Sequence, residues 1–392
     1  MNDPSSRPLA SGLEQPVLDW LAAQQPAMIS LLETLVNTDS GSRDKAGVDA
    51  VGEHIRTFLA GHGIETRTAP DDTYGDAITA RAGQGQGRPI LLMGHRDTVF
   101  PKGEPQRRPF RIDGGRAYGP GVADMKAGLV MNSFVLAAMA RFGGPSTMAL
   151  YTGDEEIGSP FSRPVIESHA AEARAVFNSE PGRAPGAVVT GRKGGVFMRF
   201  EITGKAAHSG ANFDAGASAI VELAHKTLAL HGLVDLENQL TLNVGVVAGG
   251  QTVNTVAPWA RGEVDLRFVT PHQRDATMAA IEAIMAESHV RGTSARLEIT
   301  GEFLPLVETE PGRVLYRHYG AALADLGHEP TALFTGGCAD SGFASSTGAP
   351  TICGIGPVGG RAHSPEEYVE VTTLVPRAQA LALAMLRLPA AV

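Results

Sequence analysis

The sequence predicts an α/β protein in which a domain built on a mostly parallel sheet carries an inserted α+β domain. Short continuous apolar runs at 89–93, 147–151 and 175–177 are typical of strands that are covered on both faces. Stretches with helical apolar periodicity, notably 128–142 and 369–388, alternate with such runs. These two observations favour the parallel sheet, and a third concerns the middle of the chain.

Between residues 191 and 301 the pattern changes to strand, helix, strand, strand, helix, strand, which is the order of the ferredoxin-like split βαβ motif. The periodicity predicts strands at 196–202, 241–247, 261–268 and 295–300, and helices at 215–230 and 275–288. The chain then returns to the first pattern with an apolar run at 351–353. We therefore expect residues 1–190 and 302–392 to form one domain and residues 191–301 to be inserted into it.

Composition and charge narrow the classes of function. A chain of 392 residues, of which 43% are hydrophobic, fits two domains that each bury a core. The formal charge of -9, without a run of Lys or Arg, argues against nucleic acid or an anionic membrane as partner. The two cysteines, Cys338 and Cys353, form no CxxC motif, so we expect neither a disulfide framework nor a thiolate zinc site.

The sequence also predicts a soluble, cytoplasmic protein that acts on a small molecule. Residues 1–15 are polar and lack an apolar core segment, so we expect no secretory signal. No later apolar run looks long enough to span a bilayer.

Five short stretches each offer a metal-binding side chain at the end of a predicted strand, where open α/β sheets bind their ligands. The five side chains are those of His95, Asp124, Glu156, Glu180 and His363. Two imidazoles and three carboxylates form a nitrogen and oxygen set that holds a pair of Zn²⁺ ions without cysteine. The sequence therefore predicts a metallohydrolase with two zinc ions per chain.

Each stretch also has a plain structural interpretation. Asp97 can orient His95 or merely cap the following turn, and the two are equally good when the stretch is taken alone. Asp124 alone resembles an ordinary helix N-cap, and an acidic triplet such as 154–156 is usually a solvated turn. Charge favours the metal site, because three carboxylates, two Zn²⁺ ions and one hydroxide sum to zero. Glu155 is then left to act as a base.

Six motifs, taken in chain order, carry a resemblance to a known family. They are His95-x-Asp97, residues 119–128, residues 154–159, Glu180-Pro181, residues 204–210 and His363-Ser364. The series resembles the co-catalytic zinc metallopeptidase family of glutamate carboxypeptidase, aminoacylase, acetylornithine deacetylase and succinyl-diaminopimelate desuccinylase. The likeness runs from about residue 36 to 385 and is strongest to the bacterial glutamate carboxypeptidase branch.

The resemblance implies a zinc peptidase catalytic domain with an inserted dimerisation or lid domain. It implies that His95 and Glu180 ligate one zinc ion, that Glu156 and His363 ligate the other, and that Asp124 bridges them. Glu155 would be the general base that takes a proton from a zinc-bridging water to give the attacking hydroxide, and Asp97 would orient His95.

The resemblance also implies substrate-binding residues in and near the inserted domain. His208, Asn254 and Arg267 match residues that hold the substrate carboxylate and the oxyanion, although alone they are more typical of a turn, a cap and a surface charge. Gly337 and Cys338 match a glycine-rich loop that contacts substrate, and a flexible turn is the plain alternative. A homodimer through the inserted domain is implied, with His208 reaching the partner's zinc site.

The predicted reaction is cleavage of an amide bond next to a free carboxylate, in N-acyl amino acids, folate-like conjugates or dipeptides. Residues 184–187 and 301–303 lack the cations of the glutamate branch, and Glu302 stands where one would hold an acidic side chain. We therefore expect neutral or basic side chains to be preferred over glutamate. Three alternatives stay open: a deacylase of the acetylornithine or succinyl-diaminopimelate type, a non-catalytic metal-binding homologue, and a structural protein.

Overall fold

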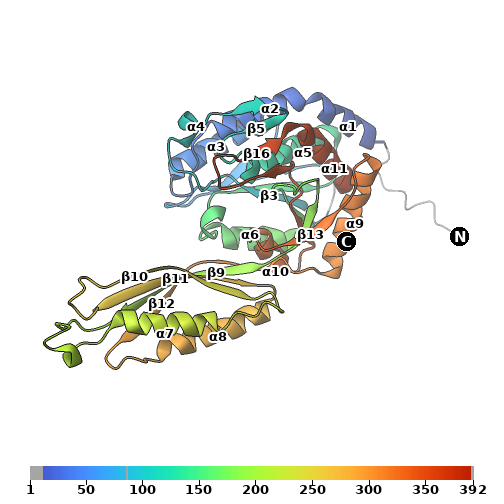
Figure 1. Cartoon of the computed structure of the whole chain (residues 1–392). Coiled ribbons are helices and arrows are strands. Elements are labelled where there is room, and N and C mark those ends of the chain that lie inside the picture. The colour runs from blue at the N-terminus through green and yellow to red at the C-terminus, as the bar shows by residue number, and fades with distance from the viewer. Residues whose placement is uncertain (1–11, 85–86, 390–392) are drawn as a thin grey trace. The chain divides into compact units, whose positions relative to one another are not determined.

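The computed structural model describes residues 12–84 and 87–389, and the chain divides into two compact units (Figure 1). Unit 1 runs to Gly191 and takes in Leu306–Thr335 and the residues from Ala339 onward, whereas unit 2 comprises Arg192–Pro305 and Gly336–Cys338. Residues 1–11, most of the segment in which no secretory signal is expected, lie outside the described residues.

Unit 1 is built on a central sheet with the strand order β1-β2-β6-β3-β7-β14-β8-β13 and a small sheet with the order β15-β16-β5-β4. Its strands are β1 (Thr66–Ala69), β2 (Ala77–Ala82), β3 (Ile90–His95), β4 (Arg111–Asp113), β5 (Arg116–Tyr118), β6 (Thr147–Thr152), β7 (Ala175–Asn178), β8 (Val188–Arg192), β13 (Ala332–Thr335), β14 (Thr351–Cys353), β15 (Gly359–Gly360) and β16 (Tyr368–Glu370). In the middle of the central sheet, β3 pairs in parallel with β6 and β7, and β14 with β7. The pairs β1–β2, β2–β6 and β8–β14 are antiparallel. Every residue of β3, β6 and β7 is buried, as their continuous apolar runs predict.

The helices of unit 1 bury one large core against this sheet. They are α1 (Glu14–Ala23), α2 (Gln25–Val36), α3 (Lys45–Gly61), α4 (Glu104–Arg107), α5 (Ala127–Phe142), α6 (Ser162–Glu172), α9 (Glu310–Asp325), α10 (Ser341–Ser346) and α11 (Leu374–Arg387). The helix α11 begins five residues later than expected, because Tyr368–Glu370 pairs with β5 as strand β16.

Helix α5 corrects one expectation. The helical stretch Val122–Phe142 is long and apolar enough to cross a membrane by length and composition, with a mean hydropathy of 1.3, so the expectation that no run is long enough is wrong. Its apolar window is 94% buried within the chain, so the stretch is the core helix of unit 1.

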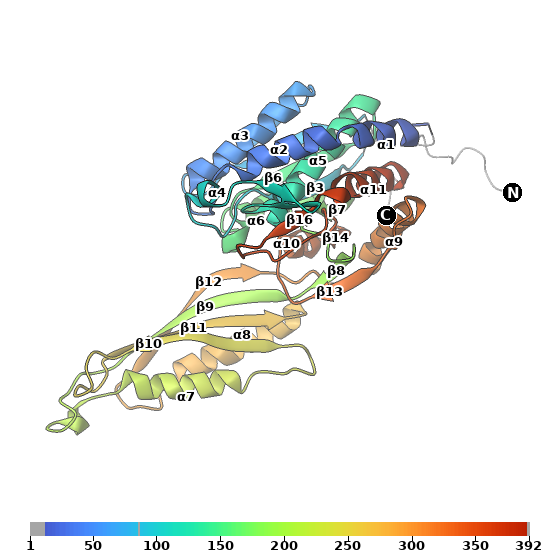
Figure 2. The same cartoon turned by 45° about the horizontal axis from the view of Figure 1, so that its top comes forward.

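Unit 2 has the predicted order of elements. They are β9 (Gly194–Thr203), α7 (Ala219–His231), β10 (Thr241–Gly249), β11 (Trp259–Phe268), α8 (Pro271–Ala286) and β12 (Ser294–Phe303). The sheet order is β10-β11-β9-β12, every pairing is antiparallel, and both helices lie on one face (Figure 2). This is the ferredoxin-like arrangement. The unit extends past the expected boundary at 301, because β12 continues to Phe303.

Helix α7 begins at Ala219 and not at 215. The hydroxyl of Ser218 accepts a hydrogen bond from the N–H of Val221, as an N-cap residue does, and residues Phe213–Ala215 form a separate 3₁₀ turn.

Candidate active site

Three of the five expected metal ligands lie at adjacent strand ends of the central sheet. His95 is the last residue of β3, Glu156 lies in the 3₁₀ turn Glu155–Ile157 after β6, and Glu180 lies two residues after β7. Because β3 is parallel to both neighbours, the carboxyl ends of the three strands meet at one edge. The Nε2 atom of His95 lies 3.7 Å from Oε1 of Glu180 and 3.9 Å from Oε2 of Glu155.

The other two ligands do not lie at strand ends of this sheet, which corrects the sequence prediction. Asp124 lies in the irregular turn Val122–Lys126, with φ of -112° and ψ of 90°, and the N-cap residue of α5 is Lys126. Asp124 is therefore not an N-cap either. His363 lies in the loop between β15 and β16 with φ of 63°, a conformation that is costly for a non-glycine residue.

These two side chains nevertheless reach the ligands on the sheet. Oδ1 of Asp124 lies 3.3 Å from Nε2 of His95, and Oδ2 lies 3.5 Å from Nε2 of His363. The Nε2 atom of His363 also lies 3.1 Å from Oε2 of Glu156. The two oxygens of Asp124 thus face two different histidines, each of which has a further carboxylate beside it.

Asp97 organises this site through its backbone as well as its side chain. The Nδ1 atom of His95 lies 3.0 Å from the backbone oxygen of Asp97 and 3.4 Å from its Oδ1, so the carbonyl is the nearer partner. If Nδ1 carries the proton, Nε2 presents a lone pair toward Asp124. The buried carboxylate of Asp97 accepts hydrogen bonds from the hydroxyl of Ser42 at 2.7 Å and from the N–H groups of Glu155 and Glu156 at 3.1 Å each.

The electrostatics of the cluster favour a bound cation. Hydrogen bonds with Asp124 and Glu156 raise the pKa of His363 to about 10, which shows how strongly the carboxylates attract positive charge. Burial raises the pKa of Glu155 well above its usual value and also raises that of Glu156. Oε1 of Glu156 is buried and has no hydrogen-bond partner among the described residues. Metal ions would compensate these buried charges, so the donor set fits a metal centre.

Two groups of side chains have ligand atoms close enough to share an ion. They are His95, Asp124 and Glu156, and His95, Glu155 and Glu180. The second group contains Glu155, so the division of Glu155 as base and Glu156 as ligand stays a prediction. His363 belongs to neither group, although its contacts with Asp124 and Glu156 place it beside them.

The candidate residues of unit 2 fall into two places. At one, Nδ1 of His208 accepts hydrogen bonds from the N–H groups of Gly210 and Ala211 at 3.2 Å each, and the backbone oxygen of Asn254 accepts one from the N–H of Ser209 at 3.0 Å. His208 and Asn254 are therefore brought together, and both are exposed. Since Nδ1 is an acceptor, Nε2 of a neutral His208 carries the proton.

At the second place, Arg267 of β11 contacts Cys338. Its Nη1 donates to Sγ of Cys338 at 2.7 Å, and its Nε donates to Oδ1 of Asp265 at 2.7 Å. The carbonyl oxygens of Gly337 and Cys338 each accept a hydrogen bond from Nη1 of Arg192 at 3.1 Å. The glycine-rich loop is thus tied to two arginines of unit 2, and its contact with substrate stays a prediction.

The comparisons with known proteins agree with this geometry. The model of peptidase family M20/M25/M40 matches residues 91–387, a range that contains all five candidate ligands. The chain belongs to this family. Carboxypeptidase G2 of Pseudomonas sp. (strain RS-16) is 31% identical over 363 residues, covering 90% of this chain and 86% of the relative.

A further relative and a solved structure are also similar to this chain. Acetylornithine deacetylase of Edwardsiella ictaluri (strain 93-146) is 26% identical, with 90% of this chain and 95% of the relative covered. A solved M20 family metallo-carboxypeptidase of Sulfolobus solfataricus has a TM-score of 0.77 at 18% identity, covering 92% of this chain and 98% of its own. The family resemblance and the α/β fold are confirmed, and this member of family M20/M25/M40 is an enzyme of the hydrolase class. The non-catalytic and structural alternatives are set aside.

Two buried acids of this M20/M25/M40 peptidase were not expected in the site. Asp340 accepts hydrogen bonds from the hydroxyls of Ser159 and Thr152, and burial raises its pKa to about 8. Glu367 accepts three backbone N–H groups from the turn that carries Asp124. Burial raises the pKa of Glu367 to about 7. Asp340 lies two residues after Cys338 and Glu367 lies four residues after His363, but neither position in the sequence distinguishes a buried acid from a solvated one.

Glu302 does not stand as a free negative charge. Its Oε1 accepts a hydrogen bond from Nε of Arg274 at 2.8 Å, and the side chain of Glu302 is 17% exposed. Because the cation of the glutamate branch is still absent at this position, the expected preference for neutral or basic side chains stays a prediction.

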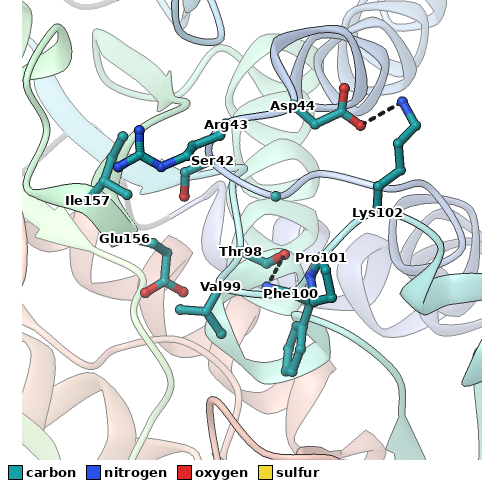
Figure 3. Close-up of a pocket in the computed structure, with 11 residues that line it drawn as sticks. Ser42, Arg43, Asp44, Thr98, Val99, Phe100, Pro101, Lys102, Glu156 and Ile157 are labelled. Atoms are coloured by element: carbon teal, nitrogen blue, oxygen red, sulfur yellow. Dashed lines mark hydrogen bonds and ion pairs between the residues drawn. The ribbon is translucent and has the colours of Figure 1, made fainter. Parts of the chain in front are cut away.

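A cavity of about 510 Å³ in unit 1 adjoins the metal cluster at Glu156 (Figure 3). Its apolar lining includes Val99, Phe100, Pro101 and Ile157. Two cations also line it. Lys102 pairs with Asp44 at 3.0 Å at one side of the cavity, whereas the exposed Arg43 lies beside Ile157 and above Glu156.

Proposed function

We propose that this chain is a hydrolase with two zinc ions that cleaves an amide bond next to a free carboxylate. One observation carries the proposal: the two oxygens of Asp124 face His95 at 3.3 Å and His363 at 3.5 Å. A carboxylate so placed suits a bridge between two ions, one beside His95 and Glu180 and the other beside His363 and Glu156. The likeness to carboxypeptidase G2 supports the choice of bond.

When bound, the metal ions would polarise the scissile carbonyl group and lower the pKa of a bound water to about 7. Glu155 takes a proton from the attacking water as its oxygen bonds to the carbonyl carbon. Nε2–H of His208 donates to the oxygen on which negative charge develops. The C–N bond then breaks, and Glu155 returns the proton to the leaving nitrogen.

Arg267 is proposed to pair with the substrate carboxylate, for which the planar guanidinium is well suited. The cavity beside Glu156 is proposed to take the group on the acyl side of the amide, because its lining combines apolar walls with the cation of Arg43. A deacylase of the acetylornithine or succinyl-diaminopimelate type uses the same core and differs only in this acyl group. The 26% identity to acetylornithine deacetylase keeps it as the second candidate.

We further propose a homodimer in which the partner supplies His208 and Asn254. These two residues lie next to the Trp259 end of β11, where His208 pairs with Thr255, whereas Arg267 lies near the other end. At a rise of 3.4 Å per residue, the eight steps from Trp259 to Arg267 span about 27 Å. A dipeptide is at most about 7 Å long. This separation supports the proposal that His208 and Arg267 of different chains act on one dipeptide-sized substrate.

The surface of unit 2 supports this proposal. Strand β10 is an edge strand on which Val246 and Val247 are 48% and 57% exposed, and Leu228 of α7 is 73% exposed. An unpaired strand edge with exposed apolar side chains beside it is typical of a protein interface.

A substrate panel tests the reaction. The zinc-loaded enzyme is offered N-acyl amino acids, folate-like conjugates and dipeptides, each beside its twin with the carboxylate blocked as an amide, and released amine is measured. We expect hydrolysis of at least one class and a loss of at least ~10-fold on blocking, the worth of a charge-assisted hydrogen bond. Equal cleavage of the blocked twins, or cleavage of none of the panel, would refute the proposal.

A further inference from the structure

The two ligands that lie off the central sheet need a separate support. His95, Glu156 and Glu180 are fixed by the pairing of β3 with β6 and β7. Asp124 and His363 come from an irregular turn and a loop, and His363 has φ of 63°. Such a backbone conformation persists only where its surroundings determine it.

One side chain joins these two segments. Glu367 is fully buried, lies four residues after His363, and donates its own N–H to the backbone oxygen of Ser364 at 3.2 Å. Its carboxylate accepts hydrogen bonds from the N–H groups of Gly121, Ala123 and Asp124, each at 2.9 Å. The Asp124 turn is therefore anchored to the segment that follows His363.

The geometry of the contact favours a carboxyl group over an amide. Oε1 of Glu367 accepts from Ala123 and Asp124, and Oε2 accepts from Gly121, so both oxygens act as acceptors. The three N–H groups converge on the carboxylate in a turn where Gly121 has φ of 72°, in the left-handed region. An amide side chain would present an NH₂ group to one of these donors.

We propose that Glu367 is a positioning residue that holds Asp124 with its two oxygens toward the two histidines. It contacts no ligand side chain and acts through the backbone. The inference rests on the proposed function in taking Asp124 as the bridging ligand.

The test compares Glu367→Gln with Glu366→Gln, the same change at the exposed neighbour. Zinc is titrated into metal-free protein in competition with a chromophoric chelator, and unfolding of the metal-free protein is measured alongside. We expect Glu367→Gln to bind zinc about 10- to 100-fold more weakly, as is usual when a group that orients a metal ligand is lost. We expect kcat to fall with KM little changed, and Glu366→Gln to match the wild type.

A purely structural role would lower the stability of the metal-free protein and leave zinc affinity and kcat of the folded fraction at wild-type values, and that result would overturn the proposal. Glu367→Asp covers the case in which Glu367→Gln does not fold. It keeps the charge on a shorter side chain, so its zinc affinity should lie below that of the wild type, and equality would again overturn the inference. If the wild type binds zinc but hydrolyses none of the panel, the proposed function fails while the zinc titration still decides the role of Glu367.

Discussion

Mixing two inactive variants tests whether each active site is shared between two chains. Glu155→Gln removes the proposed base in unit 1, and His208→Ala removes the proposed oxyanion donor in unit 2. His208 lies next to the Trp259 end of β11 and Arg267 lies near its other end, about 27 Å along the strand, so we propose that one substrate meets these two groups from different chains. We therefore expect the two variants to complement each other in a mixed dimer.

The expected recovery follows from counting sites in a C2 dimer. After random exchange, about half of the dimers are mixed. In each mixed dimer one site combines the intact Glu155 of one chain with the intact His208 of the other, and the second site carries both changes. About a quarter of all sites are then complete, so activity should return to roughly a quarter of the wild-type value.

The assay is amine release from the best substrate of the panel, measured before and after exchange, with differently tagged chains to quantify mixed dimers. The matched control mixes Glu155→Gln with the double variant Glu155→Gln/His208→Ala, which can form no complete site. Recovery in the control, or no recovery in the first mixture despite proven exchange, would refute a site shared between chains.

Three further predictions concern the metals, the base and pH. Metal-loaded protein should contain close to two zinc ions per chain and lose activity with chelator. The first ion to leave should be the one beside His363, because the side chain of His363 is 54% exposed and that of His95 only 2%. Atomic absorption at graded chelator concentrations measures the zinc that remains. Glu155→Gln should keep its zinc while kcat falls at least ~10²-fold, and loss of zinc would instead make Glu155 a ligand. Burial alone would raise the pKa of the Glu222 carboxyl, but hydrogen bonds from the N–H of Val290 and from Lys226 outweigh burial and hold this pKa below its usual value of 4.5. Its carboxylate should therefore stabilise the fold above about pH 4.5, so the difference in unfolding free energy between wild type and Glu222→Gln should shrink as pH falls below that value.

The sequence predicted the parts of the site that local patterns determine. The apolar runs of β3, β6 and β7 locate His95, Glu156 and Glu180, because a buried parallel strand has a recognisable composition and a defined end. Asp124 and His363 were assigned to strand ends as well, and this was wrong. The positions of Asp124 and His363 depend on tertiary contacts, which leave no periodic pattern in the sequence.

Glu367 shows why such contacts escape a sequence. It stands in an acidic pair after a proline, where a solvated turn is the ordinary interpretation, and its neighbour Glu366 is indeed exposed. What distinguishes Glu367 is the set of N–H groups supplied from residues 121–124, some 240 positions away. The loop 336–338 is a similar case, since Arg192 and Arg267 draw it into unit 2.

The proposed metal ligands are therefore held in place in two ways, which differ in how substitutions affect them. Many hydrogen bonds between β3, β6 and β7 hold the ligands at the ends of these strands. A substitution within one of the strands should therefore displace any one ligand only slightly. The orientation of Asp124, in contrast, depends on a few hydrogen bonds from its turn to the buried carboxylate of Glu367. Each of these is stronger than a hydrogen bond between neutral groups, because it is charge-assisted. Since Asp124 faces both histidines, a change at Glu367 reaches both halves of the centre at once. Zinc binding should therefore be most sensitive to substitution of Glu367, which contacts no ligand side chain. The zinc titration of Glu367→Gln tests this.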